Sequence, residues 1–132
     1  MSWGERRGPQ LLVAEDDPAV LELLSTRLEL AGYSLTYARD GAEALSRLRE
    51  GRPAAVLLDI GMPVMDGWEV LAALRRSETL KEVPVMVITA RNSPEDVKKA
   101  IGLGARDFLA KPFDDRQLAA RVARLVRGRR AA

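Results

Sequence analysis

The chain has 132 residues, of which 47% are hydrophobic and 30% are charged, a composition typical of one globular domain with a full core. Its 21 basic and 19 acidic residues give a formal net charge of +2, which is too small to indicate nucleic-acid binding. The sequence contains no cysteine and no histidine, which excludes disulfides, thiolate metal sites, histidine-ligated zinc and acid–base catalysis by histidine.

The amino-terminal segment, residues 1–8, lacks the apolar core of a secretory signal and predicts a flexible lead-in. No apolar run approaches the ~20 residues that a helix needs to span a bilayer. We therefore expect no membrane association and a cytoplasmic location.

Along the rest of the chain, short apolar runs alternate with segments of helical period. The apolar runs predict strands at residues 10–14, 34–38, 54–58, 85–89 and 106–110. Each run precedes a helix-start signal, in which an Asp or Ser cap is followed by proline, glycine or an acidic residue. These signals are Asp17-Pro18, Asp40-Gly41, Asp66-Gly67, Ser93-Pro94 and Asp114-Asp115.

Five strand–helix units in series predict an α/β fold with an open parallel sheet and helices on both faces. The strands at 10–14, 54–58 and 85–89 are continuously apolar and should be central, whereas 34–38 alternates polar and apolar residues and should be an edge. We expect one domain over residues 9–127 and a basic tail over 128–132.

Charged and hydroxyl side chains follow the predicted strands where each strand ends. Glu15 and Asp16 follow the first strand, and Asp59 follows the third. Ligands in an open α/β sheet bind beyond the carboxyl ends of the strands, so these three carboxylates should converge. At ~4 Å each like-charge pair costs about 1 kcal/mol in water and ~4 kcal/mol at an effective dielectric of 20, which favours a neutralising cation. Oxygen ligands without His or Cys indicate Mg²⁺ first and Mn²⁺ next.

Two further strand ends add groups that suit a phosphoryl ligand. Thr89 ends the fourth strand with a hydroxyl, and Lys111 follows the fifth with an ammonium. A metal ion, an ammonium and a hydroxyl together match the oxygens of a transferring phosphoryl group. The nucleophile would then be a carboxylate, and Asp59 at the end of the central strand is the candidate.

With these motifs in this order, the sequence resembles the receiver domain of two-component response regulators over about residues 9–127. It is either a single-domain, chemotaxis-type protein or the amino-terminal receiver of a larger regulator. The resemblance implies a flavodoxin-like, doubly wound five-stranded sheet in the order 2-1-3-4-5. The matching motifs are Glu15-Asp16, Asp59 with Met62-Pro63 and Asp66-Gly67, Thr89-Ala90 and Lys111-Pro112.

The resemblance also implies roles for the acidic residues. Asp59 would accept a phosphoryl group from a phosphohistidine of a sensor histidine kinase or of a histidine phosphotransfer protein. Asp16 and Asp59 would bind Mg²⁺ directly, Glu15 would act through a water molecule, and the backbone carbonyl of Gly61 would be a further ligand.

Three more residues would couple phosphorylation to shape. Lys111 would pair with the phosphoryl group, Thr89 would turn toward it, and Phe108 would be the aromatic switch, where many members carry tyrosine. The Lys111–Pro112 peptide bond would be cis. Gly61 and Arg91 lie at positions that vary among members, and Gly61 has no side chain to hold a hydrolytic water. We therefore predict slow self-dephosphorylation.

The resemblance implies a phosphoacceptor signalling domain rather than an enzyme, apart from its own phosphorylation and dephosphorylation. Its output domain or partner would bind residues 94–127, and it could form a homodimer, with no direct nucleic-acid contact. Two alternatives stay open: a phosphorylation-independent interaction module with the same fold, and a Mg²⁺-dependent phosphohydrolase with an aspartate nucleophile. The second normally has another Asp where this chain has Gly61.

Overall fold

The computed structural model describes residues 8–128, and its strands form one parallel sheet in the order β2-β1-β3-β4-β5. This confirms the expected fold and the edge position of the second strand. The strands are β1 (Gln10–Ala14), β2 (Ser34–Ala38), β3 (Ala55–Leu58), β4 (Val85–Thr89) and β5 (Asp107–Ala110). The helices are α1 (Pro18–Leu30), α2 (Gly41–Glu50), α3 (Gly67–Arg76), α4 (Pro94–Gly102) and α5 (Asp115–Gly128). Apart from Gly8 and Gly128, the expected lead-in and basic tail lie outside the described residues.

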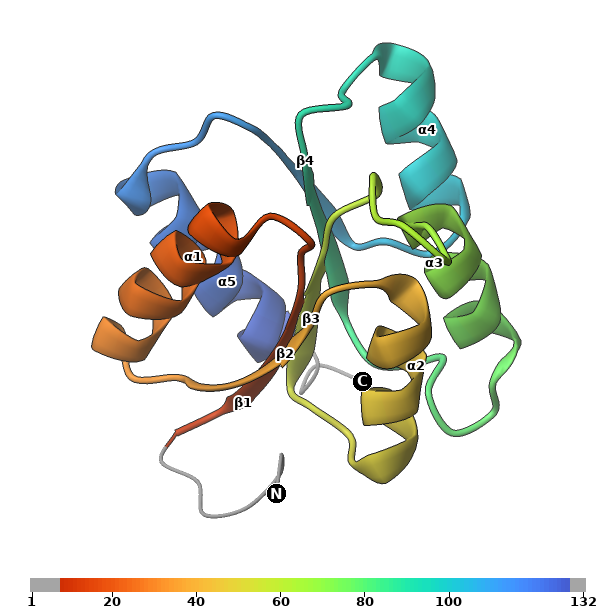
Figure 1. The fold of residues 1–132 in the computed structure, drawn as a ribbon, viewed down its shortest axis with the longest axis horizontal. Coiled ribbons are helices and arrows are strands. Elements are labelled where there is room, and N and C mark those ends of the chain that lie inside the picture. Colours follow the sequence, from red (N-terminus) through yellow and green to blue (C-terminus); the bar gives the residue numbers. More distant parts are fainter. Residues whose placement is uncertain (1–7, 129–132) are drawn as a thin grey trace.

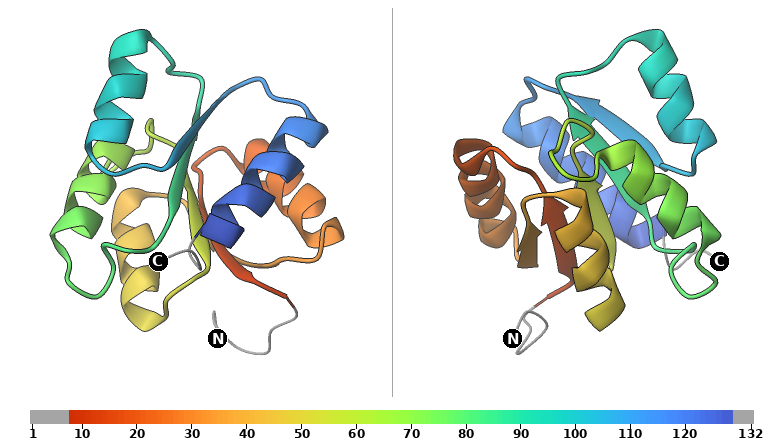
Figure 2. Two further views of the ribbon diagram at one scale, coloured as in Figure 1. Left: turned by 180° about the vertical axis from the view of Figure 1, so that it is seen from behind. Right: turned by 45° about the vertical axis from the view of Figure 1, so that its right-hand side comes forward.

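Helices cover both faces of the sheet, with α1 and α5 on one face and α2, α3 and α4 on the other (Figures 1 and 2). Successive residues of β1 alternate between the two cores, so Leu11 and Val13 pack with α1 and α5, while Leu12 and Ala14 pack with the other helices. None of the helices within residues 8–128 is long and apolar enough to cross a bilayer.

The helix starts follow the predicted capping residues. The side chain of Asp17 accepts a hydrogen bond from the backbone N–H of Ala19 at 2.9 Å. Asp66 and Glu69 form a reciprocal capping box at the start of α3, with both hydrogen bonds at 3.0 Å. These caps fix where each helix begins after the loop that leaves the carboxyl end of a strand.

Gly67 lets α3 begin directly against the end of β3. A Cβ atom at this position would lie 2.7 Å from the carbonyl oxygen of Asp59 and 2.7 Å from the Cα of Ile60. Any larger residue would therefore displace the backbone that carries Asp59, which explains why glycine follows the capping Asp66.

The β3–α3 loop contains a strained turn at Val64. This residue has a φ of 67°, and the N–H of Met65 donates to the carbonyl oxygen of Pro63 at 2.7 Å across it. This is a γ-turn with a β-branched residue at its centre, an unfavourable combination. Val64 is 83% exposed, so packing gives little compensation for the strain.

We expect Val64→Asn to raise the free energy of unfolding by about 1 kcal/mol, because asparagine tolerates positive φ better than valine. Urea denaturation measures this change. Val64→Ile is the matched control, since it keeps the β-branch and should give no gain. Equal stabilities for the asparagine variant and the parent protein would show that the turn carries no such strain.

Candidate functional site

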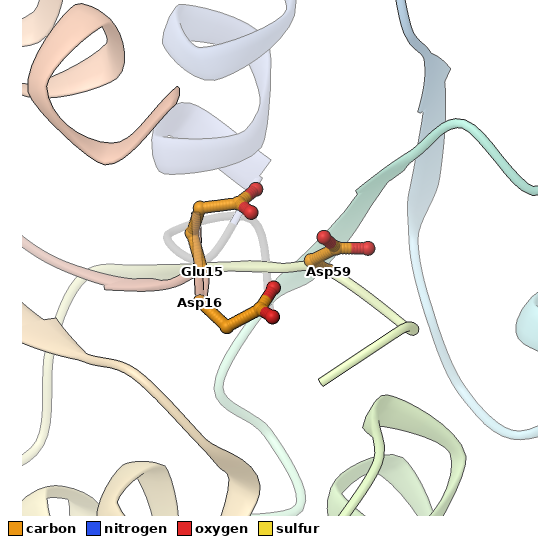
Figure 3. Close-up of side chains that lie close together, drawn as sticks. All are labelled: Glu15, Asp16 and Asp59. Carbon is orange, nitrogen blue, oxygen red and sulfur yellow. The ribbon is translucent and has the colours of Figure 1, made fainter. Parts of the chain in front are cut away.

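Three carboxylates meet at the carboxyl ends of β1 and β3. Ala14 and Leu58 are paired neighbours in the sheet, so the residues that follow them leave the sheet at the same edge. One ligand oxygen from each of Glu15, Asp16 and Asp59 lies within 4.8 Å of the others. Figure 3 shows the three side chains around a common space. The structure thus brings together the acidic residues that the sequence analysis selected.

Lys111 joins two of these carboxylates from the end of β5. Its ammonium donates to Oε1 of Glu15 at 2.7 Å and to Oδ2 of Asp59 at 3.2 Å. The Lys111–Pro112 peptide bond that follows is cis, as expected. The sequence analysis placed Lys111 at the site but did not predict its contact with Glu15.

Burial sets the electrostatics of this ion-pair cluster. Glu15 is 2% exposed. Desolvation raises the pKa of Glu15 above its ordinary value, although the hydrogen bond from Lys111 opposes that effect. Burial alone would lower the pKa of Lys111, but its hydrogen bond to Glu15 and the negative charge of Asp59 together raise it. The ammonium is therefore charged at neutral pH.

The donor set fits a hard divalent cation. All three acidic side chains offer oxygen ligands, and Asp16 is exposed to solvent. The oxygens of Glu15 are already engaged, one by Lys111 and the other by the N–H of Asp17 at 3.1 Å. The oxygens of Asp59 also accept hydrogen bonds, one from Lys111 and the other from the N–H of Gly61. The exposed carboxylate of Asp16 therefore has the most capacity to bind an ion, and one ammonium leaves the cluster with excess negative charge.

The two residues of the expected switch lie on the same face of the sheet. Thr89 is 2% exposed at the end of β4, and its Oγ1 accepts a hydrogen bond from the N–H of Arg91 at 3.2 Å. Phe108 pairs in register with Val87 and is partly buried against the core that contacts α2, α3 and α4. Because Val87 and Thr89 are two residues apart, they point to that same face.

Gly61 approaches Asp59 through its amide. The N–H of Gly61 donates to Oδ1 of Asp59 at 3.1 Å, which fixes one carboxylate oxygen of the candidate acceptor. Apart from its two neighbours in the chain, no described residue has an atom within 4 Å of the position that a Cβ of Gly61 would occupy, so the space beside Asp59 is open here.

A polar cluster beside this site was not predicted from the sequence. The guanidinium Nε of Arg91 donates to Oδ1 of Asp96 at 3.0 Å, and Asp96 also accepts from the hydroxyl of Ser93 at 2.9 Å. Burial would raise the pKa of Asp96, but the hydrogen bonds from Ser93 and Arg91 outweigh it and lower that pKa. The sequence predicted a helix start at Ser93-Pro94, but nothing in it indicated the pairing of Asp96 with Arg91.

The fold and the site agree with the comparisons with known proteins. The family model described as the response regulator receiver domain matches residues 11–123. The chain is 46% identical to the transcriptional regulatory protein PrrA of Mycobacterium leprae over 123 residues, which are 93% of this chain and 52% of PrrA.

Solved structures of similar domains show the same fold. The signal receiver domain of a signal transduction histidine kinase from Syntrophus aciditrophicus is 35% identical, with a TM-score of 0.87 over 95% of both chains. The receiver domain of sensor histidine kinase PA1611 from Pseudomonas aeruginosa is 30% identical, with a TM-score of 0.84 over 90% of this chain and 98% of that chain. In that structure a magnesium ion is coordinated in the active site cleft.

The chain spans about half the length of the curated relatives it matches. PrrA is named a transcriptional regulatory protein, so the expectation of no nucleic-acid contact is partly at odds with that relative. The family match, the relatives and the shared fold lead to one conclusion. The chain belongs to the response regulator receiver domain family and is a signalling domain of the two-component type.

Proposed function

We propose that Asp59 is the phosphoacceptor of this receiver domain. The supporting observation is the position of its carboxylate, nearly buried at the end of a central strand, with Asp16 on one side and the ammonium of Lys111 at 3.2 Å. Glu15 shares the burial and the contact with Lys111, but the ammonium lies closer to it, at 2.7 Å, which leaves Asp59 as the more weakly held of the two buried carboxylates.

The proposed reaction is the attack of an Asp59 oxygen on the phosphorus of a phosphohistidine in a histidine kinase or a phosphotransfer protein. The new O–P bond forms as the P–N bond breaks, and its electron pair returns to the imidazole ring. Mg²⁺, with Mn²⁺ as a substitute, would neutralise charge on the transferring oxygens. Asp16, Asp59 and the carbonyl of Gly61 would hold the ion, Glu15 would act through a water molecule, and Lys111 would donate to the phosphoryl group.

The proposed output is a shift between two arrangements of the domain. Phosphorylation adds a charge of about −1.5 to −2 at the strand ends. If Thr89 and Phe108 contact the phosphoryl group better in one arrangement, that arrangement gains population by the difference in free energy. The output domain or partner would read the change on α4, β5 and α5, within residues 94–127, and the same surface could form a homodimer.

The direct test is incubation with acetyl phosphate and Mg²⁺ followed by intact mass measurement. We expect the protein to gain one phosphoryl group, and we expect neither Asp59→Asn nor the parent protein in excess chelator to gain it. The same gain in Asp59→Asn would overturn the assignment of the acceptor. No gain in the parent protein would favour a phosphorylation-independent module.

The open space at Gly61 leads to a prediction about the lifetime of the acyl phosphate. A polar side chain there could position a water for attack, and such catalysis is typically worth 10²- to 10⁴-fold when fully optimised. We expect Gly61→Asn to shorten the lifetime by at least about tenfold, the partial effect of an unoptimised group. Gly61→Ala, which adds only a methyl group, is the control and should leave the lifetime unchanged.

Phosphoprotein loss after removal of the donor measures these lifetimes. A lifetime of seconds in the parent protein would contradict slow self-dephosphorylation. Equal lifetimes for all three proteins would show that no side chain at position 61 reaches the hydrolytic water.

A further inference from the structure

Trp68 contacts two cations that come from other segments of the chain. The Nζ atom of Lys99, in α4, lies 4.5 Å from the centre of its ring, and the Cζ atom of Arg91, in the β4–α4 loop, lies 5.8 Å from it. Both distances are within the range of cation–π attraction, which is strongest for tryptophan. Trp68 itself belongs to α3, so one ring connects α3, the loop and α4.

Packing alone does not explain this ring. Trp68 is 8% exposed, and its indole N–H is buried without a hydrogen-bond partner among the described residues. A buried donor without a partner is unfavourable, and an aliphatic residue would fill a core position without that cost. The face of the ring, which attracts cations, is the feature that an aliphatic residue could not supply.

Arg91 connects this ring to the switch. Its guanidinium is bound by Asp96 in the first turn of α4, and its backbone N–H donates to Oγ1 of Thr89. The hydroxyl of Thr89 therefore has a partner in the β4–α4 loop in this structure. A rotation of the Thr89 side chain that withdraws Oγ1 from this N–H breaks the hydrogen bond and removes one restraint on the loop that carries Arg91.

We propose that Trp68 is a positioning residue that opposes switching: by binding Lys99 and Arg91, it fixes α4 and the β4–α4 loop in the arrangement that keeps Thr89 bonded to Arg91. The inference rests on the proposed phosphorylation of Asp59. The switched arrangement must give up these contacts, so the ring lowers the population of the switched state in the unphosphorylated protein. Asp96 reinforces the restraint because its carboxylate pairs with the guanidinium of Arg91 at 3.0 Å.

The test compares the apparent affinity for beryllium trifluoride, a phosphoryl mimic, in the presence of Mg²⁺. Losing a partly exposed cation–π contact should raise the population of the switched state and tighten apparent binding by about two- to fivefold. We expect this change in Trp68→Leu and in Lys99→Gln, and a smaller one in Trp68→Phe, which keeps a weaker aromatic face. Lys98→Gln removes the same charge from the neighbouring exposed position of α4 and should bind like the parent protein.

Urea denaturation of the same variants separates positioning from a structural role. A Trp68→Leu protein that is less stable but binds the mimic with unchanged affinity would overturn the proposal. The proposal would also be overturned if Lys98→Gln increased the affinity for the mimic as much as Lys99→Gln does, because the effect would then come from net charge.

A second readout follows the ring itself. The chain has two tryptophans, so Trp3→Phe leaves Trp68 as the only one. In this background we expect the mimic with Mg²⁺ to increase quenching of Trp68 fluorescence by acrylamide, because release of the two cations exposes the ring. Unchanged quenching in a protein that binds the mimic would overturn the proposal while leaving phosphorylation intact. If Asp59 did not accept a phosphoryl group, both the proposed function and the proposed role of Trp68 would fail.

Discussion

Lys111→Met is expected to lower the free energy of unfolding by about 3 kcal/mol at neutral pH in the absence of Mg²⁺. Removing one partner of a buried ion pair typically costs 3–5 kcal/mol, and the lower end applies because the side chain of Lys111 is 19% exposed. Methionine keeps most of the volume of lysine, so little of this loss comes from packing. The cause is the carboxylate of Glu15, which is 2% exposed and would remain without its cation.

The pH dependence identifies that cause. Burial raises the pKa of Glu15 in the folded protein, so the folded state binds its proton more strongly than the unfolded chain does. Ionisation of Glu15 therefore reduces stability as the pH rises through its folded pKa, and the loss of Lys111 makes this reduction larger. The difference between Lys111→Met and the parent protein should be greatest at neutral pH and should shrink as the pH falls toward the ordinary glutamate pKa.

Urea denaturation across this pH range measures the effect. The double variant Glu15→Gln with Lys111→Met is the matched control, because it removes the more deeply buried of the two carboxylates that lose their cation and should recover most of the lost stability. A deficit that stays the same at every pH, or that the double variant does not reduce, would show that Lys111 stabilises the protein by packing and not by charge.

The meeting of the acidic residues was predictable because residues that follow neighbouring parallel strands leave the sheet at the same edge. Once the apolar runs are read as parallel strands, Glu15, Asp16 and Asp59 must lie at the same edge, and the structure places them there. The strand order itself came from the family resemblance and not from the residues. The predicted strand limits differ by one residue at Ala54 and Arg106, which still donate hydrogen bonds to neighbouring strands.

The contacts made by long side chains were not predictable in the same way. Lys111 was expected to bind a phosphoryl group, and in this structure it bonds to Glu15 and Asp59. Trp68 is buried, and its two cations come from segments that no sequence period relates to it. Such contacts depend on loop conformation and rotamer choice, which hydrophobic patterning does not encode.

The carboxylate cluster also predicts that Asp16→Asn is more stable than the parent protein without Mg²⁺ and less stable than the parent protein with Mg²⁺. Without the ion, Asp16 repels Glu15 and Asp59 at distances up to 4.8 Å, and within residues 8–128 Lys111 is the one cation paired with these carboxylates. Removing this exposed charge should raise the free energy of unfolding by about 1 kcal/mol, the value for a pair of like charges near 4 Å in water.

With Mg²⁺ the order should invert. An ion that binds only the folded state stabilises it by about 2.7 kcal/mol when its concentration is 100 times its dissociation constant. The parent protein should gain this amount, whereas Asp16→Asn, which lacks one of the proposed direct ligands, should gain almost nothing under the same conditions. Urea denaturation with and without Mg²⁺ measures this inversion. Asp16→Asn should have the larger free energy of unfolding without the ion, and the parent protein should have the larger one with it.

Asp17→Asn is the control that distinguishes an ion site from general charge reduction. Asp17 is the next residue along the chain and is also exposed, and asparagine is as good a helix cap as aspartate, so this variant removes one charge without weakening α1. It should keep the full stabilisation by Mg²⁺. If Asp17→Asn lost that stabilisation as completely as Asp16→Asn, the ion would be responding to the overall charge at this end of the sheet. Since Mg²⁺ binds through specific oxygen ligands, we expect Asp16→Asn to lose the stabilisation by Mg²⁺ and Asp17→Asn to keep it.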